Sequence, residues 1–142
     1  MKPLAIWVVV VAVVFGGFAL FTSSTRSTEQ VFVVVDSSFF MRSFVSDVPR
    51  ELDRIDNAEY SEFALATTRD RNTTMVHSWQ DQLTLASFDP FGPCSFDGID
   101  QFPEAAEADE RILITSSDTI TSSDTGCDTT ALADWTIIAL TP

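Results

Sequence analysis

Basic residues are scarce in this sequence, histidine is scarcer still, and each shortage excludes a class of function. Eight Lys and Arg stand against 21 Asp and Glu among 142 residues, which gives a formal net charge of -13 at pH 7. A surface this acidic repels the phosphates of nucleic acid and anionic lipid headgroups. A role in binding polyanions, including nucleic acid, is therefore excluded. His77 is the only histidine, and no nucleophile lies in register with it, so general acid–base catalysis has little to work with.

A long apolar run accounts for much of the hydrophobic content, which reaches 45% despite the charge. The nineteen residues from Pro3 to Phe21 carry no charge, and as a helix of about 1.5 Å per residue they reach roughly the thickness of a bilayer core. A cleaved secretory signal is the alternative, but its apolar region is usually about 7 to 15 residues long, and residues 20–24 make a poor cleavage site. We therefore predict a retained single-pass signal anchor over residues 1–25 and an exported domain over residues 26–142.

The charges near this run predict its orientation. Lys2 and the N-terminal amino group are the only positive charges before it, which predicts a cytoplasmic N-terminus and an exported C-terminal domain. Arginine outnumbers lysine seven to one, as is typical of GC-rich bacterial genomes. We therefore expect a bacterial inner membrane, with its lipid bilayer around the anchor, and a periplasmic domain.

Small residues form one stripe of the predicted anchor helix: Ala5, Ala12, Gly16 and Ala19. Such a stripe lets a second transmembrane helix approach closely, which predicts contact with other membrane proteins. Any anchor rich in Val, Ala and Gly shows a similar stripe by chance, and the sequence leaves both explanations open.

The exported domain combines a strong negative charge with two cysteines. Residues 26–142 hold 21 acidic and seven basic residues, a formal charge of -14, and are long enough for one domain. In an oxidising compartment Cys94 and Cys127 predict a disulfide bond between two otherwise irregular segments, which contributes roughly a few kcal/mol to stability. Two unpaired thiols are the alternative.

Five apolar runs in the exported domain predict β-strands. They occupy residues 31–35, 63–67, 74–79, 111–115 and 135–140. The polar turn at 69–72 predicts an antiparallel hairpin of the second and third strands. The first and fourth runs are continuous, as in parallel strands covered on both faces.

Two helices are expected between these strands. Apolar residues at helical spacing indicate the first: Met41, Phe44, Val45, Val48, Leu52 and Ile55. Pro49 is tolerated only in a first turn, so this helix starts late, with Ser46 or Asp47 as its cap, or is kinked. A shorter helix is expected within 99–109, with Pro103 in its first turn. The elements together predict a small, open, mostly parallel α/β sheet of Rossmann-like type with right-handed crossovers.

The loop after the first strand carries a resemblance to a known family. Its sequence, Asp36-Ser37-Ser38-Phe39-Phe40-Met41, resembles the opening of a von Willebrand factor A domain, in which an apolar strand ends in Asp-x-Ser-x-Ser, commonly followed by Met. The order of elements over roughly residues 30–142 also resembles that family, with Ile112–Asp118 in the place of its "apolar strand then Asp" segment. The resemblance implies that family's fold, and with it a site for Mg or Ca formed by hard oxygen ligands, whose open position takes a carboxylate from a protein partner.

The family's ligands match this sequence only in part. Asp36 matches the first Asp and Ser38 the first Ser, whereas Phe40 stands at the second Ser position. Asp118 is the candidate for the later Asp, although Ser116 and Ser117 stand where that acid normally follows the strand. For the middle-loop Thr the candidate is Thr84. The resemblance therefore implies either a metal-dependent adhesion module or a degenerate metal site.

Phe39 and Phe40 give the same loop a second interpretation. Exposed aromatic residues mark partner sites, and Phe is enriched at interfaces. On this interpretation the two rings turn a metal face into an apolar contact face. The alternative is that Phe40 packs with Phe44 in the core and only Phe39 is exposed.

Three further motifs are discounted. Asp124-Thr125-Gly126 matches the aspartic-protease triplet but lacks the preceding apolar residues and a second half-site, so a hydrolase is a remote alternative. The segment 91–94 resembles a thioredoxin site without its first cysteine, and a single thiol does not support dithiol exchange. Asp124, Asp128 and Asp134 lack the spacing of an EF-hand loop, which indicates a solvated acidic loop.

The sequence thus predicts a non-enzymatic, protein-binding or accessory subunit of a membrane-associated complex, which contacts partners through the loop after its first strand. The alternative is a metal-dependent adhesion module that uses Asp36, Ser38 and Asp118 with Mg or Ca; otherwise no cofactor is expected.

Overall fold

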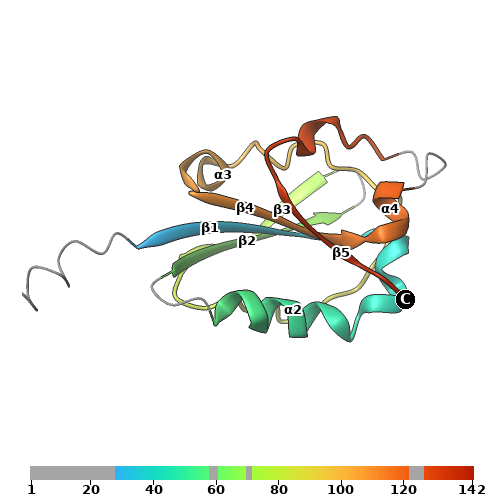
Figure 1. Ribbon diagram of the computed structural model, residues 1–142, viewed down its shortest axis with the longest axis horizontal. Helices are drawn as coiled ribbons and strands as arrows, with labels where there is room; N and C mark the ends of the chain where they lie inside the picture. The colour runs from blue at the N-terminus through green and yellow to red at the C-terminus, as the bar shows by residue number, and fades with distance from the viewer. Residues whose placement is uncertain (1–27, 58–60, 70–71, 122–126) are drawn as a thin grey trace, which may run out of the picture.

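A computed structural model describes residues 28–57, 61–69, 72–121 and 127–142, which form a sheet with one layer of helices and loops on each face (Figure 1). The elements in chain order are β1 (Glu29–Asp36), η1 (Phe39–Phe44), α2 (Asp47–Asp56), β2 (Ser61–Arg69), β3 (Asn72–Gln80), α3 (Pro103–Glu107), β4 (Glu110–Ser116), α4 (Ser117–Thr121), η3 (Thr130–Leu132) and β5 (Thr136–Leu140).

The sheet has five strands in the order β3-β2-β1-β4-β5. β1 pairs in parallel with β2 and β4, β4 pairs in parallel with β5, and only β2 and β3 are antiparallel. This confirms the predicted mostly parallel α/β sheet and the hairpin at its edge. The strand order reverses between β1 and β4, and in open α/β sheets such a switch point is where ligands bind, beyond the carboxyl ends of the strands.

The central strand shows why its sequence is continuous rather than alternating. Val31, Val33 and Val35 contribute to the core on the α2 side of the sheet, whereas Phe32 and Val34 contribute to the core on the α3 side. Successive side chains of a strand point to opposite faces, and both faces of β1 are covered, so every position must be apolar. In Figure 1, α2 covers the lower face, while α3 and the chain around η3 cover the upper one.

The predicted first helix is two short helices. The 3-10 helix η1 ends at Phe44, and α2 begins at Asp47, so Pro49 lies in the first turn of α2 as predicted. Ser46 occupies the N-cap position, but its side chain makes no capping hydrogen bond. The late start of α2, rather than a kink, therefore accommodates Pro49.

The predicted second helix is α3, with Pro103 as its first residue.

The predicted anchor, residues 1–25 with Ala5, Ala12, Gly16 and Ala19, lies outside the described residues. Within the described part of the chain, no helix has both the length and the apolar composition needed to cross a bilayer.

Candidate functional site

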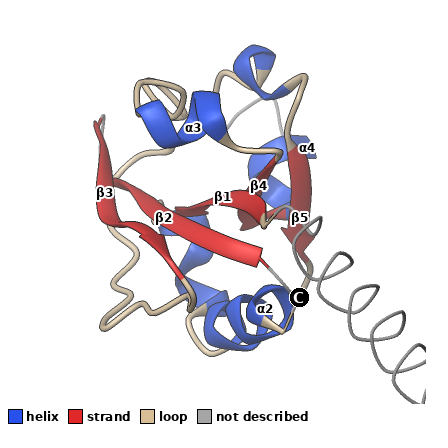
Figure 2. Ribbon diagram, turned by 90° about the vertical axis from the view of Figure 1, so that its left-hand side faces the viewer, coloured by secondary structure: helices blue, strands red, loops and turns tan. Residues whose placement is uncertain are grey.

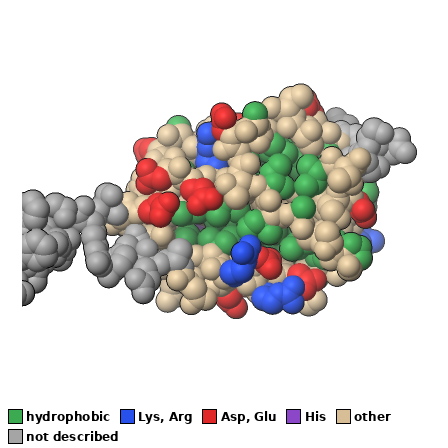
Figure 3. All heavy atoms as spheres, viewed as in Figure 1, with side chains coloured by type: hydrophobic (Ala, Val, Ile, Leu, Met, Phe, Trp, Pro, Cys, Tyr) green, Lys and Arg blue, Asp and Glu red, His purple; other side chains and the backbone are tan. Residues whose placement is uncertain are grey.

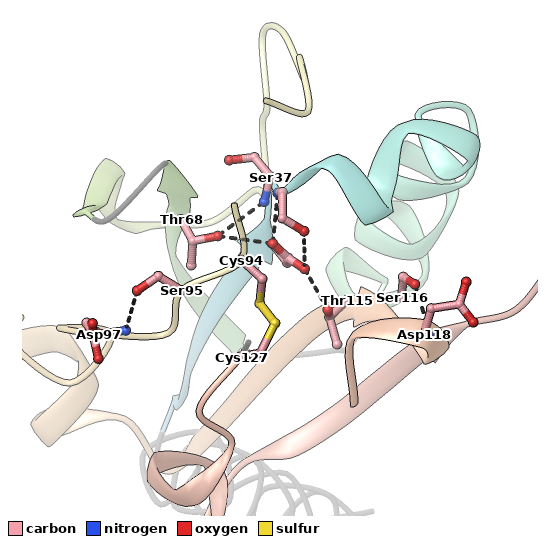
Figure 4. The surroundings of a disulfide bond; sticks show 11 residues. Ser37, Thr68, Cys94, Ser95, Asp97, Thr115, Ser116, Asp118 and Cys127 are labelled. Carbon is pink, nitrogen blue, oxygen red and sulfur yellow. Dashed lines mark hydrogen bonds between the residues drawn. A yellow bond between two sulfur atoms is a disulfide. The ribbon is translucent and has the colours of Figure 1, made fainter. Parts of the chain in front are cut away.

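Asp36 is the centre of a polar cluster at the carboxyl edge of the sheet. It is the last residue of β1, and the strands on either side of β1 bring Thr68 of β2 and Thr115 of β4 next to it. Figure 4 shows these two threonines reaching toward one point from the two strands that flank β1. The cluster therefore lies at the switch point of the sheet.

The Asp36 carboxylate is fully buried and accepts four hydrogen bonds. Oδ1 accepts from the backbone N–H of Ser38 at 2.9 Å and from the Thr68 hydroxyl at 3.3 Å. Oδ2 accepts from the Ser38 hydroxyl at 3.0 Å and from the Thr115 hydroxyl at 2.7 Å. These four donors occupy the four lone-pair sites of the carboxylate.

Neutral donors therefore stabilise this buried charge. None of the ion pairs formed by the described residues involves Asp36. A buried carboxylate requires such compensation, because an unpaired charge in the interior is strongly unfavourable. Thr68 has a double role, since its Oγ1 also accepts a hydrogen bond from the backbone N–H of Ser37 at 3.2 Å. The cluster thus fixes the start of the loop after β1.

The structure brings together only some of the predicted metal ligands. Asp36 and Ser38 are in contact, but Asp118 is exposed in α4, and Figure 4 shows its carboxylate pointing away from Thr115. The Asp118 backbone N–H donates to the Ser116 hydroxyl at 3.1 Å. Thr84 lies elsewhere, in the wall of a groove beside α2.

Thr68 and Thr115 are the site residues that the sequence reasoning missed. Thr115 ends one of the runs predicted to be strands and Thr68 directly follows another, and strands adjacent to the first would place them beside Asp36. The strand register was the missing information. Together with Asp36 and Ser38 they form a set of one carboxylate and three hydroxyls, all hard oxygen donors with a single negative charge. Among the described residues no group of three or more His, Cys, Asp or Glu side chains is placed to hold a metal ion.

An exposed aromatic pair lies beside this cluster. Phe39 is 46% exposed and Phe91 is 54% exposed, and their ring centroids lie 5.8 Å apart in an edge-to-face arrangement. The Arg42 guanidinium lies 4.6 Å from the centroid of Phe39, in cation–π geometry. We call Phe39, Phe91 and Arg42 the aromatic patch.

Phe40 takes neither of the two predicted positions. It is half-buried and packs against the α3-side core, whereas Phe44 is buried in the α2-side core, so the two rings lie on opposite faces of the sheet. The exposed partner of Phe39 is instead Phe91, more than fifty residues away in sequence. The sequence reasoning considered segment 91–94 only as a thioredoxin-like motif and missed this contact.

Backbone hydrogen bonds and a disulfide hold the aromatic patch together. The Phe91 N–H donates to the Ser37 carbonyl at 2.7 Å, and the Phe39 N–H donates to the Gly92 carbonyl at 3.0 Å. Gly92 has a φ of 92°, which a side chain would disfavour. Two residues further on, Cys94 is bonded to Cys127, with Cα atoms 5.4 Å apart (Figure 4), which confirms the predicted disulfide.

No family is matched by this chain. Comparison with protein-family models, with curated proteins and with solved structures finds no match.

The protease triplet lies outside the described residues, and the two described carboxylates of the acidic set, Asp128 and Asp134, have partners of their own. Asp124, Thr125 and Gly126 belong to the segment 122–126, which is not described. Asp128 accepts hydrogen bonds from the side chain and the backbone N–H of Thr130, and these bonds lower the pKa of its carboxyl. Asp134 lies 3.8 Å from the Arg111 guanidinium.

His77 is half-buried on the edge strand β3. Its Nδ1 lies 2.9 Å from the Ser78 carbonyl, so Nδ1 carries the proton and donates. The other ring nitrogen, Nε2, is buried and has no hydrogen-bond partner among the described residues.

Proposed function

We propose that this chain is a non-enzymatic accessory subunit of a membrane-associated complex, and that its exported domain binds a partner protein through the loop after β1. The observation that carries this proposal is the aromatic patch, in which two half-exposed phenylalanines from distant loops meet in one rigid arrangement. Solvent-exposed aromatic pairs are favourable contact surfaces because they are large and lose little conformational entropy on binding.

The position of the aromatic patch supports a binding role. It lies directly after β1, beside the switch point of the sheet, where open α/β folds bind their ligands. In the von Willebrand factor A family, which the loop resembles, the corresponding edge holds the partner's carboxylate. Here the aromatic rings and Arg42 offer an apolar surface with a cation for the same kind of contact.

The rigidity of the loop supports the proposal on energetic grounds. Burying the exposed half of each ring stabilises a complex by roughly 1 kcal/mol per ring. Backbone hydrogen bonds at 2.7 and 3.0 Å order the backbone that carries both rings before binding, so the complex does not have to order it. The Asp36 cluster has a supporting role in this interpretation, since it holds Ser37 and Ser38 in place.

The proposal is tested by mild-detergent solubilisation of membranes from the native host, followed by native electrophoresis of the tagged chain. We expect wild type to migrate in a complex, and Phe39→Ala with Phe91→Ala to lose at least nine-tenths of it. Ile137→Ala is the matched control, because Ile137 is also exposed but lies on β5. Migration of wild type alone, or equal loss with the control, would contradict the proposal.

A metal-dependent adhesion module is the second candidate, and the convergence of three hydroxyls on Asp36 favours it. Rotation of these hydroxyls would turn oxygen lone pairs toward a cation bound beside the carboxylate, and Mg or Ca suits such donors. Binding to the folded state alone would raise the melting temperature in proportion to the logarithm of the cation concentration.

A hydrolase remains the remote candidate, and it would require activity that disappears in Asp124→Ala.

A further inference from the structure

A groove of about 670 Å³ lies on the α2 side of the sheet, between α2, β3 and residues 83–88. Leu52 and Leu83 are buried in it, while Val45 and Val76 are each 41% exposed. Two of the exposed large hydrophobic side chains among the described residues therefore line the same depression. Of the residues that line it, only Asp53 is charged.

One wall of this groove is the edge strand β3, which forms the outer margin of the sheet in Figure 2. Its nine residues, Asn72–Gln80, include no Lys, Arg, Asp, Glu or Pro. Edge strands are usually protected by charges, proline or bulges, because their free N–H and C=O groups otherwise pair with another chain. Of these, β3 has irregularities in its register against β2, between Met75 and Gln80. Residues 26–142 carry a formal charge of -14, so a nine-residue edge strand without Lys, Arg, Asp or Glu is unusual in this domain.

The free part of the edge coincides with the groove. At Thr73 the carbonyl already accepts a hydrogen bond from the Gln101 side chain. From Thr74 to Gln80, no backbone group forms a hydrogen bond to backbone outside the sheet among the described residues, and the Ser78 carbonyl accepts one from the His77 side chain. Val76, His77 and Gln80 from this stretch line the groove. Because the register of β3 is irregular between Met75 and Gln80, an added strand would pair with it in short stretches, with side chains at alternate positions over the groove.

We propose that β3 and this groove bind an extended, basic segment of a partner protein, which adds to β3 as a sixth strand. Backbone hydrogen bonds to β3 supply the alignment, and apolar side chains at alternate positions enter the groove, as in other cases of strand addition. Basic side chains of the segment lie near Asp53 and in the field of the acidic domain, which also speeds association.

Charge selects this occupant over a second copy of the chain. Pairing of β3 with β3 would bring together two domains of charge -14 each, and like charges across an interface are unfavourable. The other edge strand, β5, is also uncharged and exposes Ile137. It has only five residues, and the pocket beside it is lined by two ion pairs, Arg50 with Asp47 and Arg54 with Glu51, so it has no net charge to attract a basic segment. Figure 3 shows basic and acidic side chains side by side on this face of the molecule.

Three short peptides test the proposal on the full chain in nonionic detergent. The first alternates Lys and Val over seven residues, the second alternates Glu and Val, and the third is the first with proline at its centre. Fluorescence anisotropy measures affinity, and amide hydrogen exchange locates the peptide. We expect only the first peptide to bind and to slow exchange between residues 74 and 80. Equal binding of the Glu peptide or the proline peptide would overturn the proposal.

Two matched variants locate the contact. Val76→Lys places a like charge at the exposed rim of the groove and is expected to weaken the Lys-Val peptide at least tenfold, because Val76 is too exposed for the change to prevent folding. Ile137→Lys introduces the same charge on β5 and should change affinity by less than twofold. Equal effects of the two variants, slowed exchange at residues 136–140, or a homodimer with protected β3 amides would each contradict the proposal. The Phe39→Ala and Phe91→Ala variant should bind the peptide like wild type, so this test is independent of the aromatic patch.

Discussion

Asp36 carries a negative charge into the interior, and four neutral donors compensate it. Hydrogen bonds to a charged group contribute about 1.5–3 kcal/mol each, about twice the value of neutral ones. The donors come from the ends of three adjacent strands, so the carboxylate joins β1, β2 and β4 at the edge of the sheet. Asp36 thus connects three strands of the sheet and also positions the loop that carries Phe39.

Removal of one donor measures this role. In Thr115→Val the Asp36 Oδ2 loses its shortest hydrogen bond, 2.7 Å, and the methyl group that replaces the hydroxyl offers no donor. We expect the free energy of unfolding to fall by about 1–3 kcal/mol in urea denaturation with the disulfide intact. Thr115→Ser keeps the hydroxyl and should lose clearly less. Equal losses in the two variants would show that the methyl packing of Thr115, rather than its hydrogen bond, is what matters.

The elements were predictable where the sequence signal is local, and not where the signal depends on tertiary contacts. The strands β1 and β4 follow from continuous apolar runs, and Pro49 places the start of α2. The short helix α4 lies in a Ser/Thr/Asp tract that shows no helical periodicity, so it was not predictable from the sequence. A helix of five residues depends on its tertiary surroundings for stability.

The site shows the same division between local and distant information. Asp36 and Ser38 were found because they are two residues apart and carry a recognisable pattern. Thr68, Thr115 and Phe91 come from three distant segments, and only the strand register and the paired loops bring them to Asp36 and Phe39. Asp118 was chosen by analogy with a segment order, and in the structure a turn of α4 carries its side chain out to solvent.

The disulfide acts at the scale of elements, because it joins the loop before α3 to the chain that leads into η3. Cys94 and Cys127 are 33 residues apart in sequence, for which the chain-entropy model gives a stabilisation of roughly 3–4 kcal/mol. We expect Cys94→Ser with Cys127→Ser to lose about that amount in urea denaturation. A reductant should destabilise wild type to a similar extent and leave the double variant unchanged, which is the control. Wild-type stability that does not respond to full reduction would contradict this assignment.

At the scale of the whole molecule, charge and apolar surface are separated. Many of the exposed side chains of the described residues are acidic, whereas the aromatic patch and the groove between α2 and β3 are two apolar regions with few charges. The strong net charge keeps such domains apart from one another and favours basic partners. The contact proposed at β3 therefore selects against copies of the same chain, and each of the two proposed contacts has its own variants for testing.

The same net charge allows general screening to be distinguished from a specific metal site. Self-repulsion within a domain of charge -14 destabilises the folded state, and salt weakens it as the Debye length falls from about 30 Å at 0.01 M to about 8 Å at 0.15 M. We expect NaCl with a chelator to raise the melting temperature by a few degrees over this range. MgCl2 or CaCl2 at equal ionic strength should add nothing beyond this rise if Asp36 is fully satisfied by its four donors. A further rise of several degrees that disappears in Asp36→Asn, compared with the same salts on Asp118→Asn, would instead support a cation beside Asp36 and favour the adhesion-module candidate.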